Sequence, residues 1–294
     1  MRSLARGWLA MACTLAVLFT VCACAPLEAE DRTPAGLTLV VMDPLASPLS
    51  CPCVKGYAQR DYDKLAAYLE KQLGRPVTVA YSDSLTTALQ KKTEGKADII
   101  IGKRSVVEFD ARNSKLDVVP VADLTGKDGL TTMTGLIVVP KDDPAKTAAD
   151  LKGYRIIFGS PECDEKYAAP ITLLKSKGVT LPEKLETSAS CADGATAILE
   201  ARSGKGAAVI SSYAKPLLEG CGTINKGDLR VVGETEPVPF ITAFVSSRLS
   251  KADSQAITDA LLAVKSDLTL RTVLETKNGF VPAAKAVGTS SKKN

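Results

Sequence analysis

Two series of short apolar runs alternate with amphipathic helical segments along this chain of 294 residues. Runs such as 97–102 and 207–211 are mainly apolar and bounded by glycine or polar residues, which is typical of the buried strands of parallel sheets. Alternating strands and helices predict an α/β fold. Two separate series favour two lobes, although the periodicity alone also allows one large doubly wound domain.

Capping residues and helix breakers mark several of the predicted boundaries. Asp61 and Ser84 can each cap a helix, and Gly74 and Pro76 end the first one. In the first series, strands are predicted at 37–42, 77–81, 97–102, 118–122 and 132–139, with helices at 61–73 and 85–92. In the second series, strands are predicted at 155–158, 185–188, 207–211, 229–232 and 239–245, with helices at 148–151, 167–175, 194–202, 215–219 and 254–265.

The charge and the residue composition exclude several classes of function. The net charge is +4, and a cleaved leader would remove Arg2 and Arg6 and leave +2. Because basic and acidic residues alternate along the chain, the sequence predicts no nucleic-acid partner. The chain has no histidine, which removes the commonest general base and the commonest metal ligand. We therefore expect neither enzymatic activity nor a cofactor.

The first 25 residues have the pattern of an export signal. Arg2 and Arg6 precede an apolar run over 8–24, which gives a charged region followed by a hydrophobic one. The run ends in Val21-Cys-Ala-Cys24, which is similar to a bacterial lipobox with Cys24 as the lipidated residue. An ordinary cleavage site and an uncleaved membrane anchor are the two alternatives. All three place the remaining chain outside the cytoplasm, in the periplasm or on the outer face of the cell membrane.

Five cysteines follow the predicted leader, and four of them come after strand-like runs. These four are Cys51, Cys53, Cys163 and Cys191, and the fifth is Cys221. Strand ends form the ligand cleft of open α/β sheets, so we expect the first four to face a ligand site. Disulfides persist outside the cytosol, and an odd number of cysteines leaves at least one thiol outside any internal pair.

An ordered series of segments resembles the periplasmic phosphate, phosphite and phosphonate solute-binding proteins of ABC transporters. The segments 68–79 (YLEKQLGRPVTV) and 95–102 (GKADIIIG) resemble the first lobe of that family. The segment 150–158 (DLKGYRIIF) resembles the start of its second lobe, and 195–209 resembles its next helix and strand. The resemblance covers about 37–265. It implies a type II periplasmic-binding-protein clamshell, in which two α/β lobes with mostly parallel sheets are joined by a two-strand hinge.

The same resemblance implies a function and an order of parts. It implies an extracytoplasmic solute-binding protein of an ABC-type uptake system, which takes a small molecule or ion and delivers it to an ABC permease. We expect a monomer that contacts the membrane only through a lipid at its N-terminus, if Cys24 carries one. The expected parts are a leader at 1–25, a tether at 26–36, lobe 1 at 37–138, lobe 2 at 139–232, a return to lobe 1 with C-terminal helices at 233–288 and a disordered tail at 289–294.

The resemblance carries over to the ligand site unevenly. Ser105 falls in a Gly-x-x-Ser turn at the expected cleft edge, and the family's cleft aromatics suggest Tyr57 and Tyr81. The family's run of hydroxyl residues at a helix N-terminus, which holds an oxyanion, is replaced by Cys163-Asp-Glu-Lys166. Carboxylates there repel an oxyanion and compete for the same N–H groups. The predicted ligand-binding residues are Asp43, Ser47, Cys51, Cys53, Tyr57, Tyr81, Ser105, Cys163, Asp164, Glu165, Ser190, Cys191, Asp193 and Ser211.

The cysteines leave the function open between three readings. As structural residues, Cys163 and Cys191 would form a disulfide, and Cys51 and Cys53 would pair locally or one of them with Cys221. As ligands, the first four would hold a soft metal ion or perform redox chemistry. The main prediction, which follows from the family resemblance, is the transport receptor. The alternatives are a cysteine-based soft-metal or redox protein on the same fold and an accessory subunit of a periplasmic dehydrogenase.

Overall fold

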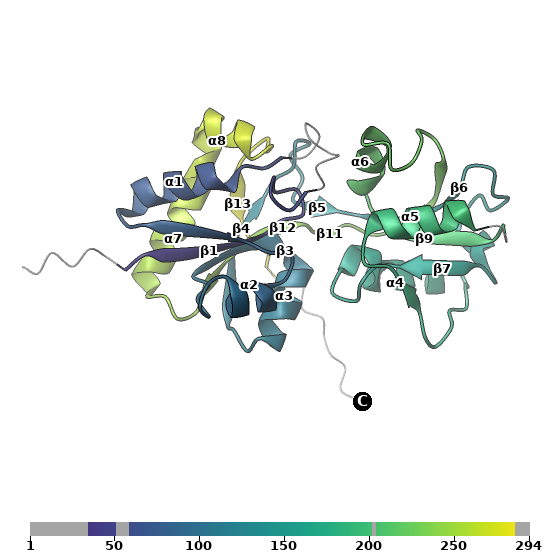
Figure 1. Ribbon diagram of the computed structural model, residues 1–294, viewed down its shortest axis with the longest axis horizontal. Helices are drawn as coiled ribbons and strands as arrows, with labels where there is room; N and C mark the ends of the chain where they lie inside the picture. Colours follow the sequence, from purple (N-terminus) through teal and green to yellow (C-terminus); the bar gives the residue numbers. More distant parts are fainter. Residues whose placement is uncertain (1–34, 51–58, 202–203, 286–294) are drawn as a thin grey trace, which may run out of the picture. The chain divides into compact units, whose positions relative to one another are not determined.

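The computed structural model describes residues 35–50, 59–201 and 204–285, and it contains two principal sheets (Figure 1). We call the six-stranded sheet with its helices lobe 1 and the five-stranded sheet with its helices lobe 2. The predicted α/β fold with two sheets is confirmed.

Six strands form the sheet of lobe 1. They are β1 (Leu37–Met42), β2 (Val77–Tyr81), β3 (Ile99–Lys103), β4 (Val118–Leu124), β12 (Ile241–Ser246) and β13 (Phe280–Pro282), in the order β13-β4-β12-β3-β1-β2. β1 pairs parallel with β2 and β3, whereas β12 runs antiparallel between β3 and β4. β3 and β12 are buried along their whole length, which explains why both read as continuous apolar runs.

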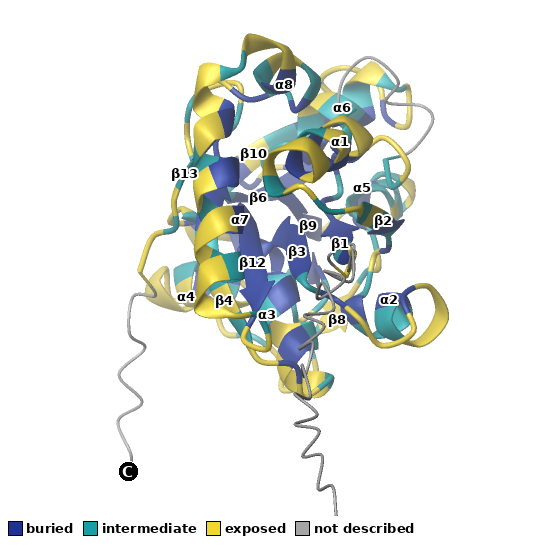
Figure 2. Ribbon diagram, turned by 90° about the vertical axis from the view of Figure 1, so that its left-hand side faces the viewer, coloured by how far each residue is buried: buried dark blue, intermediate teal, exposed yellow. Residues whose placement is uncertain are grey.

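Helices cover both faces of this sheet. α1 (Tyr62–Leu73), α7 (Lys251–Ala263), the short helix η4 (Val264–Ser266) and α8 (Leu268–Val273) share one core with the sheet. α2 (Leu85–Lys91) and α3 (Arg104–Asn113) pack on the opposite face. Figure 2 shows the buried side of these helices turned toward the strands. α1 follows its sequence signals, because Asp61 accepts a hydrogen bond from the Lys64 N–H (3.2 Å) and Gly74 ends the helix at φ 65°.

Five strands form the sheet of lobe 2. They are β6 (Gly135–Pro140), β7 (Arg155–Phe158), β8 (Glu186–Thr187), β9 (Gly206–Ser211) and β10 (Leu229–Glu234), in the order β10-β6-β9-β7-β8. β7 pairs parallel with β8 and β9, and β6 runs antiparallel to β9 and β10. The short helix η2 (Ala148–Leu151) and α4 (Ala168–Ser176) pack on one face, and α5 (Cys191–Glu200) and α6 (Ala214–Gly220) on the other.

Two short strands connect the lobes. β5 (Thr132–Met133) leads from lobe 1 to lobe 2, β11 (Val238–Pro239) leads back, and the two pair antiparallel as a separate sheet. The chain therefore crosses twice, as the sequence predicts. β6 begins in lobe 2 at Gly135 and β10 ends there at Glu234, while the expected boundaries at 138/139 and 232/233 stay predictions.

The structure differs from the predicted elements in several places, of which three bear on the description of the lobes. α3 is a helix where none was predicted, because only Arg104, Val107 and Ala111 of its ten residues are buried and the apolar stripe is narrow. The bounds of α8, which lies in the region where C-terminal helices were expected, were not predicted, and β13 was missed, since both are short. The predicted strand at 132–139 is divided into β5 and β6.

The predicted leader at 1–25, with Cys24, and the whole predicted tail at 289–294 lie outside the described residues. Within the described part of the chain, no helix is both long and apolar enough to cross a membrane.

Candidate functional site

A cavity of about 900 Å³ is lined by segments of both lobes, and we call it the central pocket. From lobe 1 it is lined by the end of β1 with the following loop, the loop into α2, and the end of β3. From lobe 2 it is lined by parts of 160–166, 189–192 and 213–223. Chain segments that follow strands in α/β sheets commonly form ligand sites, and this volume is within the range of small-molecule pockets.

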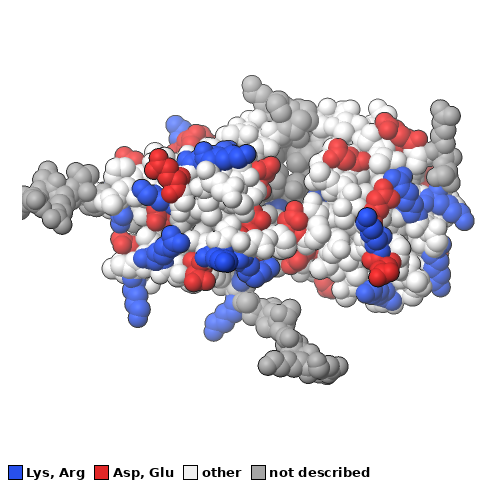
Figure 3. All heavy atoms as spheres, turned by 60° about the horizontal axis from the view of Figure 1, so that its bottom comes forward, with Lys and Arg blue, Asp and Glu red and all other residues white. Residues whose placement is uncertain are grey.

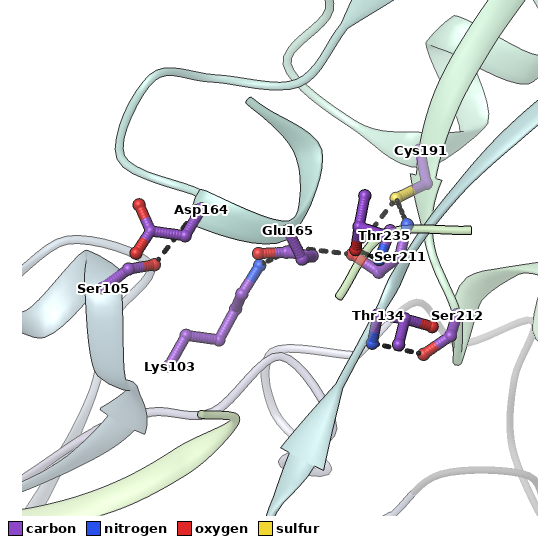
Figure 4. Close-up of polar contacts among 10 residues, drawn as sticks. Lys103, Ser105, Thr134, Asp164, Glu165, Cys191, Ser211, Ser212 and Thr235 are labelled. Atoms are coloured by element: carbon purple, nitrogen blue, oxygen red, sulfur yellow. Dashed lines mark hydrogen bonds and ion pairs between the residues drawn. The ribbon is translucent and has the colours of Figure 1, made fainter. Parts of the chain in front are cut away.

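A polar network in which Glu165 is the central residue joins the two lobes beside this pocket (Figure 4). Lys103, the last residue of β3, forms an ion pair with Glu165 Oε1, and the Ser211 hydroxyl donates to the same oxygen over 2.8 Å. The Lys103 side chain is 9% exposed and that of Glu165 is 1% exposed. A cation from lobe 1 and a hydroxyl from lobe 2 thus meet at one buried carboxylate oxygen.

The pKa values of this pair move in the directions that keep both groups charged. Burial alone would raise the pKa of Glu165, but attraction to Lys103 and the hydrogen bonds from Lys103 and Ser211 outweigh it and lower the pKa. Burial alone would lower the pKa of Lys103, but the Glu165 carboxylate raises it above its ordinary value. The two groups therefore form a true ion pair at neutral pH.

The position of Glu165 depends on a glycine in the neighbouring strand. Glu165 belongs to a single-turn helix, η3 (Asp164–Lys166), which follows the loop after β7. A Cβ placed on Gly135 would lie 1.8 Å from the Glu165 carbonyl oxygen, so the backbone can approach this closely only at glycine. Gly135, at the start of β6, thus allows η3 to pack against the sheet with the Glu165 side chain turned toward lobe 1.

A second contact between the lobes lies one residue away. The backbone N–H of Asp164 donates to the Ser105 hydroxyl over 3.2 Å. Burial, followed by repulsion from Glu165 and Glu108, raises the pKa of the Asp164 carboxyl. Ser105 was predicted to contact the ligand; its hydroxyl contacts lobe 2 in this structure, and the ligand contact stays a prediction.

Cysteine sulfurs from lobe 2 line the central pocket. Cys163, Cys191 and Cys221 are free thiols and all three line it. Cys191 Sγ accepts the Ser211 N–H over 3.4 Å. Burial raises the pKa of the Cys163 thiol despite the nearby Lys103, so this sulfur is held in its neutral form. The predicted disulfide between Cys163 and Cys191 is not formed in the structure.

Of the four cysteines predicted for the alternative metal site, only Cys163 and Cys191 belong to the described residues. Among the described residues, no group of three or more cysteine or carboxylate side chains is placed to hold a metal ion. Cys51 and Cys53, two members of the predicted set, lie outside the described residues.

The structure distributes the remaining predicted site residues unequally. Ser190 lines the pocket, and with Asp193 it forms a capping box at the start of α5. In this capping box the Asp193 carboxylate accepts a hydrogen bond from the Ser190 N–H. Tyr81 donates its hydroxyl to Asp63 over 3.0 Å, and Ser47 is exposed outside the pocket lining. Tyr57 lies outside the described residues.

Asp43 is a structural residue of lobe 1. Its carboxylate is fully buried and accepts hydrogen bonds from Arg60 (2.8 Å), the Tyr62 hydroxyl (2.5 Å) and the Leu45 N–H (2.8 Å). Each carboxylate oxygen is therefore already bonded within the lobe, and Asp43 is not part of the pocket lining.

Sequence reasoning missed most residues of the pocket lining, and three of them are polar or aromatic residues with defined surroundings. Lys103 ends a fully buried strand, and that position after an apolar run was the available signal. Tyr213 lines the pocket and stacks on Phe240 with ring centroids 5.4 Å apart. Lys166 is 6% exposed and lines the pocket, and its ammonium has no hydrogen-bond or ion-pair partner among the described residues. Neither aromatic stacking nor a missing partner can be read from sequence spacing.

The ion pair predicts a specific dependence of stability on pH. Because the pKa of Glu165 lies below its ordinary value of 4.5, its stabilisation is present above pH 4.5 and is lost as the pH falls through the folded-state pKa. We expect urea denaturation to show wild type more stable than Glu165→Gln at pH 7, with the difference narrowing below pH 4.5. Parallel stability curves for the two proteins across this range would contradict the assignment.

Comparison with protein families gives one match that spans most of the chain. A family model described as the periplasmic substrate-binding protein of a phosphonate ABC transporter matches residues 56–287. No curated protein matched the chain.

Charges of both signs are interspersed on the face of the molecule in Figure 3, with no continuous basic surface there.

Solved structures with a similar fold include three proteins at low sequence identity. A Xanthomonas citri protein bound to chloride is 16% identical with a TM-score of 0.63, covering 85% of this chain and 92% of that one. A binding protein component of a phosphonate ABC transporter from Pseudomonas aeruginosa is 15% identical with a TM-score of 0.62, covering 84% and 81%. PhnD1 from Prochlorococcus marinus in complex with methylphosphonate is 14% identical with a TM-score of 0.62, covering 84% and 92%. These similarities concern the fold.

Proposed function

Since the chain belongs to the phosphonate ABC-transporter family of periplasmic substrate-binding proteins, we propose that its central pocket captures a small solute for transfer to an ABC permease. The observation that carries the proposal is the cavity of about 900 Å³ lined by both lobes of a chain that matches this family over 56–287. The family is one of solute receptors, and we propose that this chain likewise has no enzymatic activity.

The connection between the lobes supports a receptor mechanism. Among the described residues, β5 and β11 are the one pair of connecting strands, and small backbone rotations in such a pair can change the separation of two rigid lobes. The solute would contact surfaces of both lobes, so its binding energy would favour the arrangement in which the lobes enclose it. A permease would then distinguish loaded from empty receptor by the positions of the lobes.

The lining of the pocket supports a neutral or zwitterionic solute with an apolar part. Apolar side chains from both lobes line it, including Met42, Leu49 and Leu217. Acidic and basic groups are balanced, because Asp83 and Glu162 line it together with Lys92 and Lys166, and Lys103 is paired with Glu165. A solute with compensating charges or none fits such a surface without leaving an uncompensated charge.

The location and the oligomeric state belong to the same proposal. The family is periplasmic, and the charged and apolar pattern of residues 1–25 supports export of this chain. We propose a monomer, held at the membrane by a lipid on Cys24 if the lipobox-like sequence is processed. The metal alternative gains no specific support, since no three cysteine or carboxylate side chains among the described residues are placed to hold an ion, and no contact of those residues points to a dehydrogenase.

Filling the pocket should abolish solute binding without unfolding the protein. We expect a solute found by native mass spectrometry, or by a thermal-shift screen of amino acids, neutral sugars, phosphate and methylphosphonate, to stabilise wild type. At a hundredfold excess over Kd the gain is about 2.7 kcal/mol. Leu217→Trp replaces an aliphatic side chain of the pocket lining with a bulky indole ring, and it should lose most of this ligand-induced stabilisation.

Leu268→Trp is the matched control, because Leu268 is 69% exposed on α8 and lies outside the pocket lining. It should retain the full ligand-induced shift. If the purified protein carries no solute and none of the panel raises its melting temperature, the receptor function is refuted. The same conclusion holds if both tryptophan variants respond like wild type.

A further inference from the structure

The donors around Glu165 form an anion subsite whose anion belongs to the protein itself. The Lys103 ammonium and the Ser211 hydroxyl both donate to Glu165 Oε1, and the carboxylate is 1% exposed (Figure 4). A buried ammonium and a hydroxyl aimed at one oxygen are the donors that a carboxylate or phosphate ligand requires. Here the chain supplies that carboxylate through η3.

The subsite is assembled from both lobes. Lys103 closes β3 in lobe 1, whereas Ser211 ends β9 and Glu165 lies on η3, both in lobe 2. The Asp164 N–H contact to Ser105 adds a second link between the same two segments. Neutralisation of Lys103 therefore requires no bound solute, and the bonds that join the lobes at this point are intramolecular.

The position also belongs to the solute pocket. Lys103, Cys163 and Lys166 line the central pocket, and Glu165 lies in the chain between the last two. A ligand anion that reached Lys103 would have to displace the Glu165 carboxylate or share the site with it. Two carboxylate-like charges at one ammonium would repel each other in this buried environment.

We propose that Glu165 acts as an internal ligand: it fills an anion subsite formed by Lys103 and Ser211, and so excludes phosphate- and phosphonate-type oxyanions from it. This inference rests on the proposed receptor function and specifies its solute class. The solute is neutral or zwitterionic and binds in the remaining pocket, while the internal carboxylate takes the role that a solute anion would otherwise have at Lys103.

Removing the internal carboxylate should create an anion receptor. Glu165→Ala leaves the Lys103 ammonium and Ser211 hydroxyl facing a space of carboxylate size. We expect acetate, formate, phosphate or methylphosphonate to raise the melting temperature of Glu165→Ala in a saturable manner. Affinity for at least one of these anions, measured by calorimetry, should be about tenfold or more above that of wild type.

Two control variants separate this effect from general salt stabilisation. The double variant Lys103→Ala/Glu165→Ala lacks the subsite cation and should lose the gained anion affinity. Glu186→Ala removes a carboxylate from an exposed pair with Arg155, in which both side chains are nearly half exposed, and should gain no anion affinity. A purely structural role for Glu165 would destabilise Glu165→Ala without creating saturable anion binding.

The wild-type measurement keeps the inference falsifiable if Glu165→Ala does not fold. The affinity of Glu186→Ala for chloride gives the level of non-specific anion binding. The affinity of wild type for phosphate and for methylphosphonate should not exceed that level. Tight binding of either oxyanion to wild type, or a folded Glu165→Ala that gains no anion affinity, overturns the inference. Neither result affects the receptor function, which is tested by Leu217→Trp and the solute screen.

Discussion

Replacement of Lys103 with alanine is expected to lower the free energy of unfolding by about 3–5 kcal/mol at pH 7, because it leaves the Glu165 carboxylate buried without its cation. The Ser211 hydroxyl would then be its one remaining hydrogen-bond donor among the contacts described above. Urea denaturation followed by circular dichroism measures this loss.

The pH dependence of Lys103→Ala identifies the cause of the loss. Without the cation, burial raises the folded-state pKa of Glu165 above the unfolded value, so the penalty applies at high pH and shrinks as the carboxyl becomes protonated. We expect the stability deficit to narrow as the pH falls from 7 toward 4. Lys92→Ala is the matched control, because Lys92 also lines the pocket but is exposed, and its loss should stay within about 0.5 kcal/mol. A deficit of equal size in both variants would contradict the role given to the ion pair.

Asp43→Ala should destabilise lobe 1 by a similar amount, about 3–5 kcal/mol. The substitution removes the only ion-pair partner that the described residues give Arg60, whose side chain is 3% exposed. It also removes the acceptor of the fully buried Tyr62 hydroxyl. Arg60 Nε already has no hydrogen-bond partner among the described residues, so little compensation is available. Chemical denaturation at neutral pH is the measurement.

The exposed pair between Arg155 and Glu186 provides the comparison for Asp43. Glu186→Ala breaks an ion pair at the surface of lobe 2 and should cost about 1 kcal/mol or less. An Asp43→Ala protein with wild-type stability would show that the buried network of lobe 1 contributes no net stability. In that case Asp43 would have to be reconsidered as a functional residue.

The two sheets could be predicted from sequence because their central strands leave few alternatives. Ile99-Ile-Ile101 and Ala207-Ala-Val-Ile210 are too short for buried helices and are flanked by glycine or polar residues. α3 could not be predicted in the same way, because Arg104 and Glu108 contribute charge to a helix whose buried stripe is narrow. Tertiary packing, and not local pattern, decides such a segment.

The site could be predicted only in part, because its contacts join residues that are distant in the chain. The acidic replacement at Asp164 and Glu165 was visible, and so was its conflict with an oxyanion. The partner of Glu165 was not visible, because Lys103 lies 62 residues away in the other lobe. Asp43 follows a strand in a manner typical of ligand residues, yet Arg60 and Tyr62 enclose it. Sequence position identifies strand ends but does not show which way each side chain points.

The order of strands in lobe 1 has a consequence for how the molecule is made. β12 lies between β3 and β4, although it comes from the last part of the chain. A chain that emerges from its N-terminus has every strand of lobe 2 once Glu234 has appeared, whereas β3 lacks its second neighbour until Ser246 follows and β4 keeps an open edge until Pro282 follows. Lobe 1 is therefore the first lobe to be synthesised and the last to be completed. A chaperone that shields the edges of β3 and β4 would protect the protein during the interval when these strands can pair with other chains.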